Sequence, residues 1–156
     1  INEVKKYIEK YFEEIIVIKC GGSVLLDENL FKQFIEDVSV LYELGLSVIV
    51  VHGGGKNIKK KLDKLNVESK FIDGLRVTDE KTIKVVEEAL LELNSEIVNN
   101  LKNYKINAVS VAPHNKNIIK IKTENKELGF VGSPKEIDSS SIFKIIKEKK
   151  IPIVVP

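Results

Sequence analysis

Two glycine-rich segments combine glycines with a side chain suited to chemistry, and each follows a short apolar run. They are Lys19-Cys20-Gly21-Gly22-Ser23 and His52-Gly53-Gly54-Gly55. Consecutive glycines let backbone N–H groups approach an anion closely, and a helix starting just after them adds the positive end of its dipole. Lys19 would place an ammonium in the same space. The pattern predicts a phosphate- or carboxylate-binding site, although a plain glycine turn or close helix-on-strand packing explains the same residues.

Neither segment matches a common nucleotide signature. No glycine lies five residues before Gly55, and Asn57 stands where a Walker A loop has Ser or Thr after its Lys. Ile58 occupies the position of the third glycine in a dinucleotide-binding fingerprint. The glycine chemistry is therefore expected to belong to another class of site.

Arg76 is the single arginine among 25 basic residues. It lies within Gly74-Leu75-Arg76-Val77-Thr78, just before an expected helix. A planar guanidinium grips a carboxylate with two parallel hydrogen bonds, which an ammonium does not do. We therefore expect Arg76 to bind a substrate carboxylate, the alternative being a structural arginine bonded to backbone carbonyls.

The elements that must position these residues alternate between strand and helix. Apolar, largely β-branched runs predict strands at 15–18, 48–51, 108–111 and 151–155. Apolar residues at helical spacing predict helices at 2–13, 28–44, 56–65, 79–103 and 139–149. A changed pattern around 116–132 predicts a β-hairpin. This order is typical of a three-layer α/β/α sandwich with a mainly parallel central sheet, in which ligands bind beyond the carboxyl ends of the strands.

Capping residues indicate where two of the helices begin and end. Asp27 is expected to cap the helix at 28–44, and Gly45 to end it. Thr78 is expected to cap the long helix at 79–103. Two polar residues of that long helix either face the site or face solvent, namely Asn94 and Asn99.

Length and composition exclude several classes of protein. A chain of 156 residues suits one domain, here 1–156, and 43% hydrophobic with 31% charged residues excludes a disordered polar chain. A net charge of +2 gives no general attraction to nucleic acid. No apolar run approaches the roughly 20 residues that span a bilayer. The single cysteine, Cys20, favours a reducing compartment, and His52 and His114 lack zinc-ligand spacing.

Taken in order, these segments resemble the amino-acid kinase family. The two glycine-rich segments are shared across that family, whereas Gly74-Leu75-Arg76-Val77-Thr78-Asp79 is more specific. Residues 128–132 and 151–156 also match, and the resemblance covers roughly residues 10–156. It implies the family's three-layer fold, phosphoryl transfer from ATP with Mg²⁺, and N-acetyl-L-glutamate as the small-molecule substrate.

The resemblance also implies a role for each candidate residue. Lys19 would be catalytic, stabilising the charge that develops on the transferred phosphoryl group, and Gly21 and Gly22 would offer N–H groups near the γ-phosphate. The acyl amino acid would be bound by Gly53, Gly54, Gly55 and Arg76. No residue of the chain is expected to ligate the metal directly. Phosphoryl transfer depends mostly on positioning and charge neutralisation, so these groups suit it.

Members of that family continue well past the length of this sequence. We therefore expect residues 1–156 to form the N-terminal, acyl-amino-acid-binding lobe, with the nucleotide-binding lobe outside this chain. A cytoplasmic homo-oligomer without nucleic acid or membrane partners is expected. The amphipathic segment 2–13 would either interlock chains or cover the sheet.

Two alternatives remain open at this stage. The chain resembles in part the regulatory domain of acetylglutamate synthases, which holds an amino acid without turning it over, because residues 88–94 lack a glycine that interrupts the helix in many related kinases. The other alternative is a family kinase for carbamate, uridylate or isopentenyl phosphate. Arg76 argues against the latter because its segment suits a carboxylate-bearing amino acid. The stretch 112–117 departs from the family pattern and leaves the exact acyl substrate open.

Overall fold

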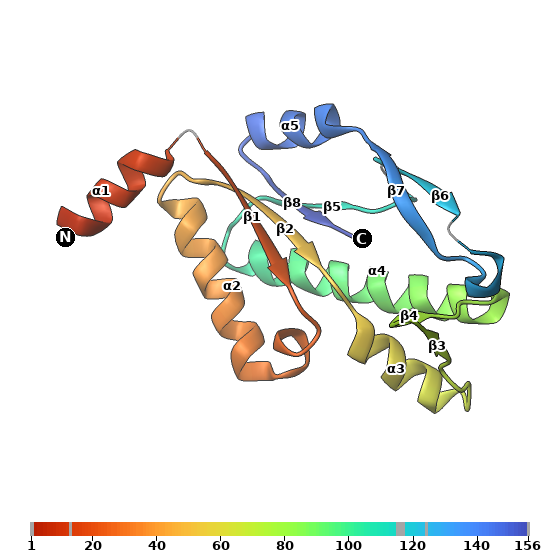
Figure 1. Cartoon of the computed structure of the whole chain (residues 1–156). Coiled ribbons are helices and arrows are strands. Elements are labelled where there is room, and N and C mark those ends of the chain that lie inside the picture. Colours follow the sequence, from red (N-terminus) through yellow and green to blue (C-terminus); the bar gives the residue numbers. More distant parts are fainter. Residues whose placement is uncertain (1, 13, 115–117, 124, 156) are drawn as a thin grey trace.

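A parallel four-stranded sheet forms the centre of the computed structural model, which describes residues 2–12, 14–114, 118–123 and 125–155. Its strands, in spatial order, are β1 (Ile15–Cys20), β2 (Ser47–His52), β8 (Ile151–Val154) and β5 (Ala108–Val111) (Figure 1). β1 and β2 are paired from Ile15↔Ser47 to Cys20↔His52. Both strands therefore end level with each other at the carboxyl edge, where the two glycine segments begin.

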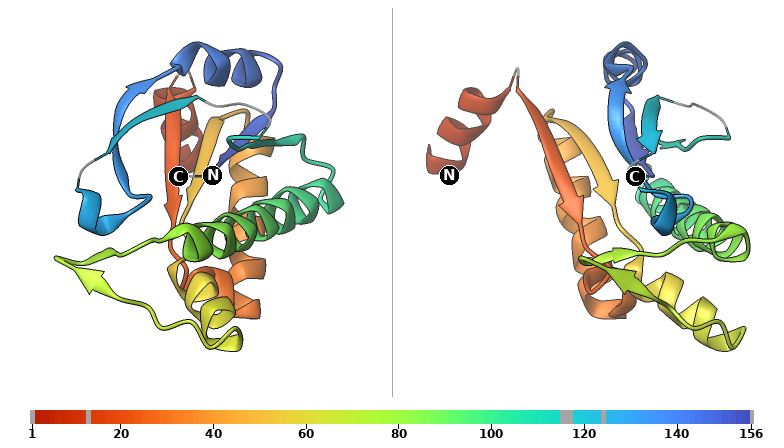
Figure 2. Two further views of the ribbon diagram at one scale, coloured as in Figure 1. Left: turned by 90° about the vertical axis from the view of Figure 1, so that its right-hand side faces the viewer. Right: turned by 45° about the vertical axis from the view of Figure 1, so that its right-hand side comes forward.

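Helices pack on both faces of this sheet and complete the expected three layers. They are α2 (Glu28–Glu43), α4 (Glu80–Asn103) and α5 (Ser139–Lys147), whereas α3 (Gly55–Lys64) packs against α4. α2 and α4 cover one face, where Ile35 and Ile97 join Val50 and Ile153 in the larger core. α5 lies on the other face, where Ile145 packs in a separate cluster (Figure 2). Every residue of the central strand β8 is buried. This agrees with its continuous apolar sequence, which is typical of a strand covered on both faces.

The ends of α2 lie where the sequence predicts them. The Asp27 carboxylate accepts two backbone N–H groups of the first turn at 3.0 Å, which satisfies donors that the helix itself leaves unpaired. Gly45 follows the last turn with a φ of +82°. A glycine adopts this left-handed conformation without the penalty that a Cβ would bring.

The predicted cap of α4 is wrong by one residue. The carboxylate of Asp79, rather than Thr78, caps the helix and accepts the backbone N–H of Thr82 at 2.7 Å. The hydroxyl of Thr78 donates instead to the carbonyl of Arg76 at 3.0 Å. Thr78 is buried, and its backbone is committed to the 128–130 segment, so it cannot take the capping position.

Two antiparallel hairpins lie outside the central sheet. β6 (Ile119–Thr123) and β7 (Gly132–Ile137) form an antiparallel hairpin. The prediction of a hairpin around 116–132 ends where β7 begins, so it includes the first strand but only the first residue of the second. Residues 116, 117 and 124 of that prediction lie outside the described residues. A second hairpin, β3 (Phe71–Ile72) and β4 (Leu75–Arg76), was not predicted. It carries Arg76, so its position decides where the guanidinium lies.

The first helix, α1 (Asn2–Tyr11), projects from the amino end of β1 (Figure 2). It does not cover the sheet, which was one of the two roles considered for this segment. The aromatic side chains Tyr7 and Phe12 are 58% and 61% exposed. Within the described residues, none of the helices combines the length and the apolar character needed to cross a membrane.

Candidate functional site

Two glycine loops leave the carboxyl edge of the sheet side by side. The N–H of Gly53 donates to the carbonyl of Cys20, with the two atoms 2.9 Å apart. A methyl group placed on Gly22 would lie 3.5 Å from the backbone nitrogen of Lys56. The loop after β1 therefore rests against the start of α3, which directly follows β2 (Figure 1). The structure thus brings Gly21 and Gly22 together with the Gly53–Gly55 segment.

The glycines differ in the space around them. A side-chain carbon added at Gly21 or Gly55 would meet no atom within 4 Å, whereas one added at Gly54 would lie 2.7 Å from Cδ2 of Leu90. Gly54 therefore permits α4 to pack closely on the loop. Gly21 and Gly55 have open space where a Cβ would lie.

The start of α3 favours negative charge. Gly54 is the N-cap, and no side chain of the described residues accepts the first N–H groups of the helix. The first turn contains no acidic residue and does contain Lys56. Unpaired N–H groups and the helix dipole together attract anions. A phosphate or carboxylate is the chemistry that this helix start can bind.

Lys19 and Cys20 end β1 on opposite faces, because successive strand residues alternate in direction. Lys19 is exposed, and Cys20 is 4% exposed within the core. Burial raises the pKa of the Cys20 thiol, and a protonated thiol is a poor nucleophile. At this strand end, Lys19 is the side chain with the exposure and charge to meet a phosphoryl group.

His52 ends β2 as a buried, hydrogen-bonded residue. Its Nε2 atom lies 3.1 Å from the amide nitrogen of Asn94, and its Nδ1 atom lies 3.2 Å from the carbonyl oxygen of Gly53. The Asn94 amide also donates to the carbonyl of Ile153 at 2.9 Å. Burial lowers the pKa of His52 below its ordinary value, and the Gly53 hydrogen bond opposes this shift more weakly. The imidazole is therefore neutral at physiological pH.

Asn94 is the residue that sequence reasoning left undecided and the structure places beside the site. It is 1% exposed, whereas Asn99 is exposed on another side of α4. A signal was available in the sequence. Asn94 lies four residues after Leu90 and four before Val98, so a polar residue interrupts an apolar helical stripe.

Arg76 makes its described contacts within its own hairpin region. Its guanidinium donates to the Ser69 hydroxyl and lies over the Phe71 ring, 4.7 Å from the ring centroid. The hairpin extends sideways from the carboxyl edge of the sheet (Figure 2). No described contact joins Arg76 to the glycine loops, so the structure does not bring these two predicted parts of the site into contact.

A backbone connection ties the Arg76 hairpin to the β6–β7 hairpin. The N–H of Thr78 donates to the carbonyl of Leu128 at 2.9 Å, and the N–H of Phe130 donates to the carbonyl of Thr78 at 2.8 Å. A Cβ on Gly129 would collide with the Thr78 carbonyl, and Gly129 has a φ of +67°. Between the two hairpins lies a cavity of about 370 Å³, with both Leu75 and Leu128 in its lining.

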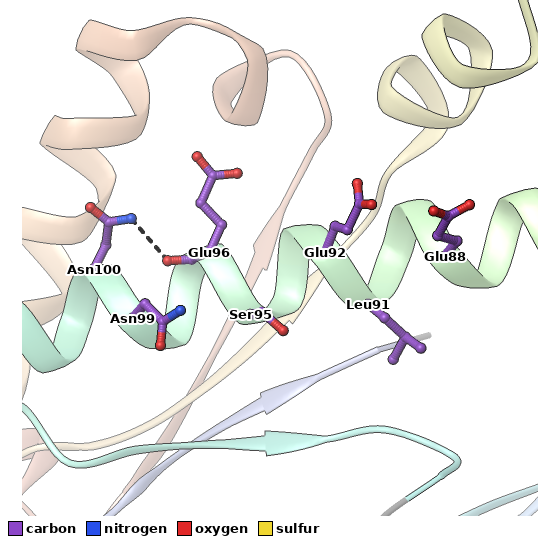
Figure 3. A pocket seen from close by; sticks show the side chains of 7 residues that line it. All are labelled: Glu88, Leu91, Glu92, Ser95, Glu96, Asn99 and Asn100. Atoms are coloured by element: carbon purple, nitrogen blue, oxygen red, sulfur yellow. Dashed lines mark hydrogen bonds between the residues drawn. The ribbon is translucent and has the colours of Figure 1, made fainter.

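A groove of about 590 Å³ runs along α4. Its lining is acidic, unlike the start of α3, which favours anions. Its lining includes Glu88, Glu92 and Glu96, which follow one another along the helix (Figure 3). Lys61 pairs with Glu92 at 2.7 Å and with Glu88 at 3.3 Å. Three carboxylates repel a phosphate, so this groove is not the anion site. No group of three or more His, Cys, Asp or Glu residues that could hold a metal ion occurs in the described part of the chain.

The chain is similar to proteins of one family along nearly its whole length. It is 53% identical over 156 residues to acetylglutamate kinase from Pelagibacter ubique, with 100% of this chain and 54% of the relative covered. It is 40% identical over 152 residues to acetylglutamate kinase from Campylobacter fetus, with 96% and 54% covered. The chain thus spans about half the length of these relatives.

A solved structure has a similar fold. The structure of smu.665 from Streptococcus mutans matches with a TM-score of 0.82 at 27% identity, covering 90% of this chain and 58% of the other. The family model described as "Amino acid kinase family" matches residues 14–156, a span that includes both glycine loops, the Arg76 hairpin and all four strands of the central sheet. On this evidence the chain belongs to the amino acid kinase family.

Proposed function

We propose that this chain forms the acyl-amino-acid-binding lobe of a kinase that phosphorylates the side-chain carboxylate of N-acetyl-L-glutamate with ATP. The observation that carries the proposal is the pairing of two glycine loops at one sheet edge, with open space where a Cβ would lie at Gly21 and Gly55. The similarity to acetylglutamate kinases along the full length of the chain supports the same reaction.

In the proposed reaction a substrate carboxylate oxygen bonds to the γ-phosphorus, the bond from that phosphorus to the bridging oxygen breaks, and ADP leaves. Lys19 would neutralise charge on the transferred group, and the N–H groups of Gly21 and Gly22 would donate to its oxygens. Gly53, Gly54 and Gly55 would hold the acyl amino acid against the start of α3. Such a site accelerates phosphoryl transfer by holding the reactants in line and stabilising charge.

Arg76 would bind the α-carboxylate of the substrate. A guanidinium has five N–H donors. Ser69 accepts from one end of the guanidinium, and Phe71 supports its plane. The remaining donors suit a carboxylate, and the contacts to Ser69 and Phe71 would restrict the side chain before substrate arrives.

ATP and Mg²⁺ enter this proposal as co-substrates. The relatives are about twice as long as this chain, and the nucleotide-binding lobe is proposed to lie in the part that this chain does not match. Mg²⁺ would be carried by the nucleotide phosphates, which are oxygen ligands of the kind that this ion prefers. The chain's own part would be to hold the acceptor carboxylate beside the γ-phosphate.

The test is acceptor-dependent release of ADP. The full-length protein is incubated with ATP, Mg²⁺ and N-acetyl-L-glutamate, and the acyl phosphate is trapped with hydroxylamine. We expect hydroxamate and ADP in equal amounts, and neither product with unacetylated L-glutamate at the same concentration. Carbamate, uridylate and isopentenyl phosphate serve as competing acceptors. Calorimetric binding of acetylglutamate without ADP release would establish the regulatory alternative instead, and absence of both would reject either function.

A further inference from the structure

A series of hydrogen bonds connects α4 to the second glycine loop, and the donor and the acceptor of each bond can be assigned. The carbonyl of Ile153 can only accept, so the amide nitrogen of Asn94, 2.9 Å away, must face it. The same nitrogen lies 3.1 Å from Nε2 of His52. An amide nitrogen only donates, so Nε2 must accept and the imidazole proton must lie on Nδ1. That Nδ1–H then donates to the carbonyl of Gly53, 3.2 Å away.

The direction of these hydrogen bonds fixes the peptide that joins Gly53 and Gly54. Its carbonyl is held toward His52, and a trans peptide is planar, so the N–H of Gly54 points the opposite way. The N–H of Gly53 is already committed to the carbonyl of Cys20. The N–H of Gly54 has no acceptor among the described residues. Because Gly54 is a buried residue, this N–H is an unpaired donor at the start of α3 that a bound anion would satisfy.

We infer that Asn94 and His52 are positioning residues whose hydrogen bonds aim the Gly54 N–H at the bound anion. This inference rests on the proposed function, because the anion would be the acyl amino acid or the transferred phosphate. His52 acts through Gly53, and Asn94 acts through His52, so neither contacts the reacting atoms.

The burial of Asn94 supports a positioning role over simple packing. Its Oδ1 atom is buried without a hydrogen-bond partner, which costs stability. Leu93 and Ile97 beside it on α4 are fully buried apolar residues, so packing alone would favour an apolar residue at this position. Asn94 retains a defined use because both of its N–H groups donate, one to Ile153 and one to His52.

The test compares two variants of His52 that keep different halves of the imidazole. The amide nitrogen of asparagine takes the place of Nδ1, so His52→Asn keeps the donor to Gly53. The amide oxygen of glutamine can take the place of the accepting Nε2, so His52→Gln can still accept from Asn94 but lacks the donor to Gly53. In the full-length protein we expect His52→Asn to retain most of its kcat. His52→Gln and Asn94→Leu should lose about 10- to 100-fold in kcat, the scale of a misplaced reacting group.

A second measurement reads the hydrogen bonds without activity. Long-range ¹H–¹⁵N spectra of the full-length wild type should show the His52 proton on Nδ1, and Asn94→Leu should release that preference. A proton on Nε2, or equal kcat losses in His52→Asn and His52→Gln, would overturn the inference. If the wild type transfers no phosphate, the proposed function fails, while the spectra still decide which atoms donate in the hydrogen bonds between Asn94, His52 and Gly53. Should either His52 variant fail to fold, Asn94→Leu and the wild-type spectra decide the inference.

Discussion

At the scale of single residues, Lys19 offers the clearest separation between binding and catalysis. Its ammonium is exposed at the end of β1 and has the charge to stabilise a transferring phosphoryl group. In the full-length protein we expect Lys19→Ala to lower kcat by about 100-fold or more while changing the KM for acetylglutamate little. Steady-state kinetics with both substrates measures this. Lys32→Ala, at an exposed position on α2, is the control and should behave as wild type.

Arg76 should act mainly on substrate affinity. Replacing its planar fork by an ammonium in Arg76→Lys should weaken acetylglutamate binding by about 1–3 kcal/mol, the scale of a charged hydrogen bond. Calorimetry on the full-length protein measures the change. Ser69→Ala removes the hairpin partner of the guanidinium and leaves the charge. An equal loss in both variants would assign Arg76 to holding the hairpin rather than the substrate.

His52 should make stability depend on pH in a window set by its lowered pKa. Below pH 6.5, the ordinary pKa of histidine, His52 is protonated in the unfolded chain but stays neutral in the folded chain until a lower pH is reached. The unfolding free energy should therefore fall as the pH decreases through that value. Urea unfolding at about pH 7.5 and about pH 5.5 measures the slope. His52→Gln, which lacks the ionisable imidazole, should have a smaller slope than the wild type.

The components of the site differ in how far local sequence determines them. Gly21, Gly22 and the Gly53–Gly55 segment follow strands directly, and parallel strands end at a common edge, so their proximity follows from the strand pattern. The partner of His52 is Asn94, 42 residues away on α4. Helical periodicity marks Asn94 as buried, but which residue it meets depends on how α4 crosses the sheet. The position of Arg76 likewise depends on tertiary contacts of a hairpin that sequence analysis missed.

At the scale of elements, the junction of Thr78 with Gly129 holds two hairpins together. Gly129→Ala places a methyl group against the Thr78 carbonyl in a left-handed backbone conformation. We expect a loss of about 1–3 kcal/mol in unfolding free energy and a higher KM for acetylglutamate. Denaturant unfolding and kinetics measure the two effects. Gly74→Ala is the matched control, since Gly74 has a φ of +80° but open space around its missing Cβ. A similar loss there would show that backbone strain alone matters.

The helices and the main strands follow the sequence closely, because periodicity reflects which side of an element is buried. The hairpin β3–β4 was missed because each strand has two residues, too few for any alternation to register. Its turn did carry a signal. Asp73-Gly74 is a favoured two-residue hairpin turn, and both residues have positive φ values of 48° and 80°. The cap of α4 was misassigned because Thr78 and Asp79 are both good caps, and only tertiary contacts select between them.

At the scale of the whole molecule, the core between α4 and the sheet should carry much of the stability. Leu101 is fully buried there. Leu101→Ala should lower the unfolding free energy by about 2–5 kcal/mol, because the deleted methyl groups leave a cavity. Urea unfolding followed by circular dichroism measures it. Val40→Ala, at a side chain that is 53% exposed on α2, should change stability far less. Comparable losses would mean that α2 carries a buried contact outside this core.

The three-layer architecture was predictable because four apolar runs alternate with amphipathic helices. The strand order was not, since β8 comes last in the sequence yet lies between β2 and β5. Such an insertion depends on long-range pairing that no local pattern encodes. The direction of α1 was equally unpredictable, because its amphipathic face allows more than one packing partner.

Because β1 and β2 end at the same level, the evolution of this fold is constrained in where residues can be inserted or deleted. The two loops meet because Cys20 and His52 are paired at the final rung, and one hydrogen bond continues that pairing into Gly53. Deleting one residue from either strand would reverse the side-chain directions beyond it and shift one loop by about 3.3 Å relative to the other. Relatives that share the proposed anion site should therefore confine insertions and deletions to the distant turns, such as the one between α2 and β2, and preserve the length of this strand pair.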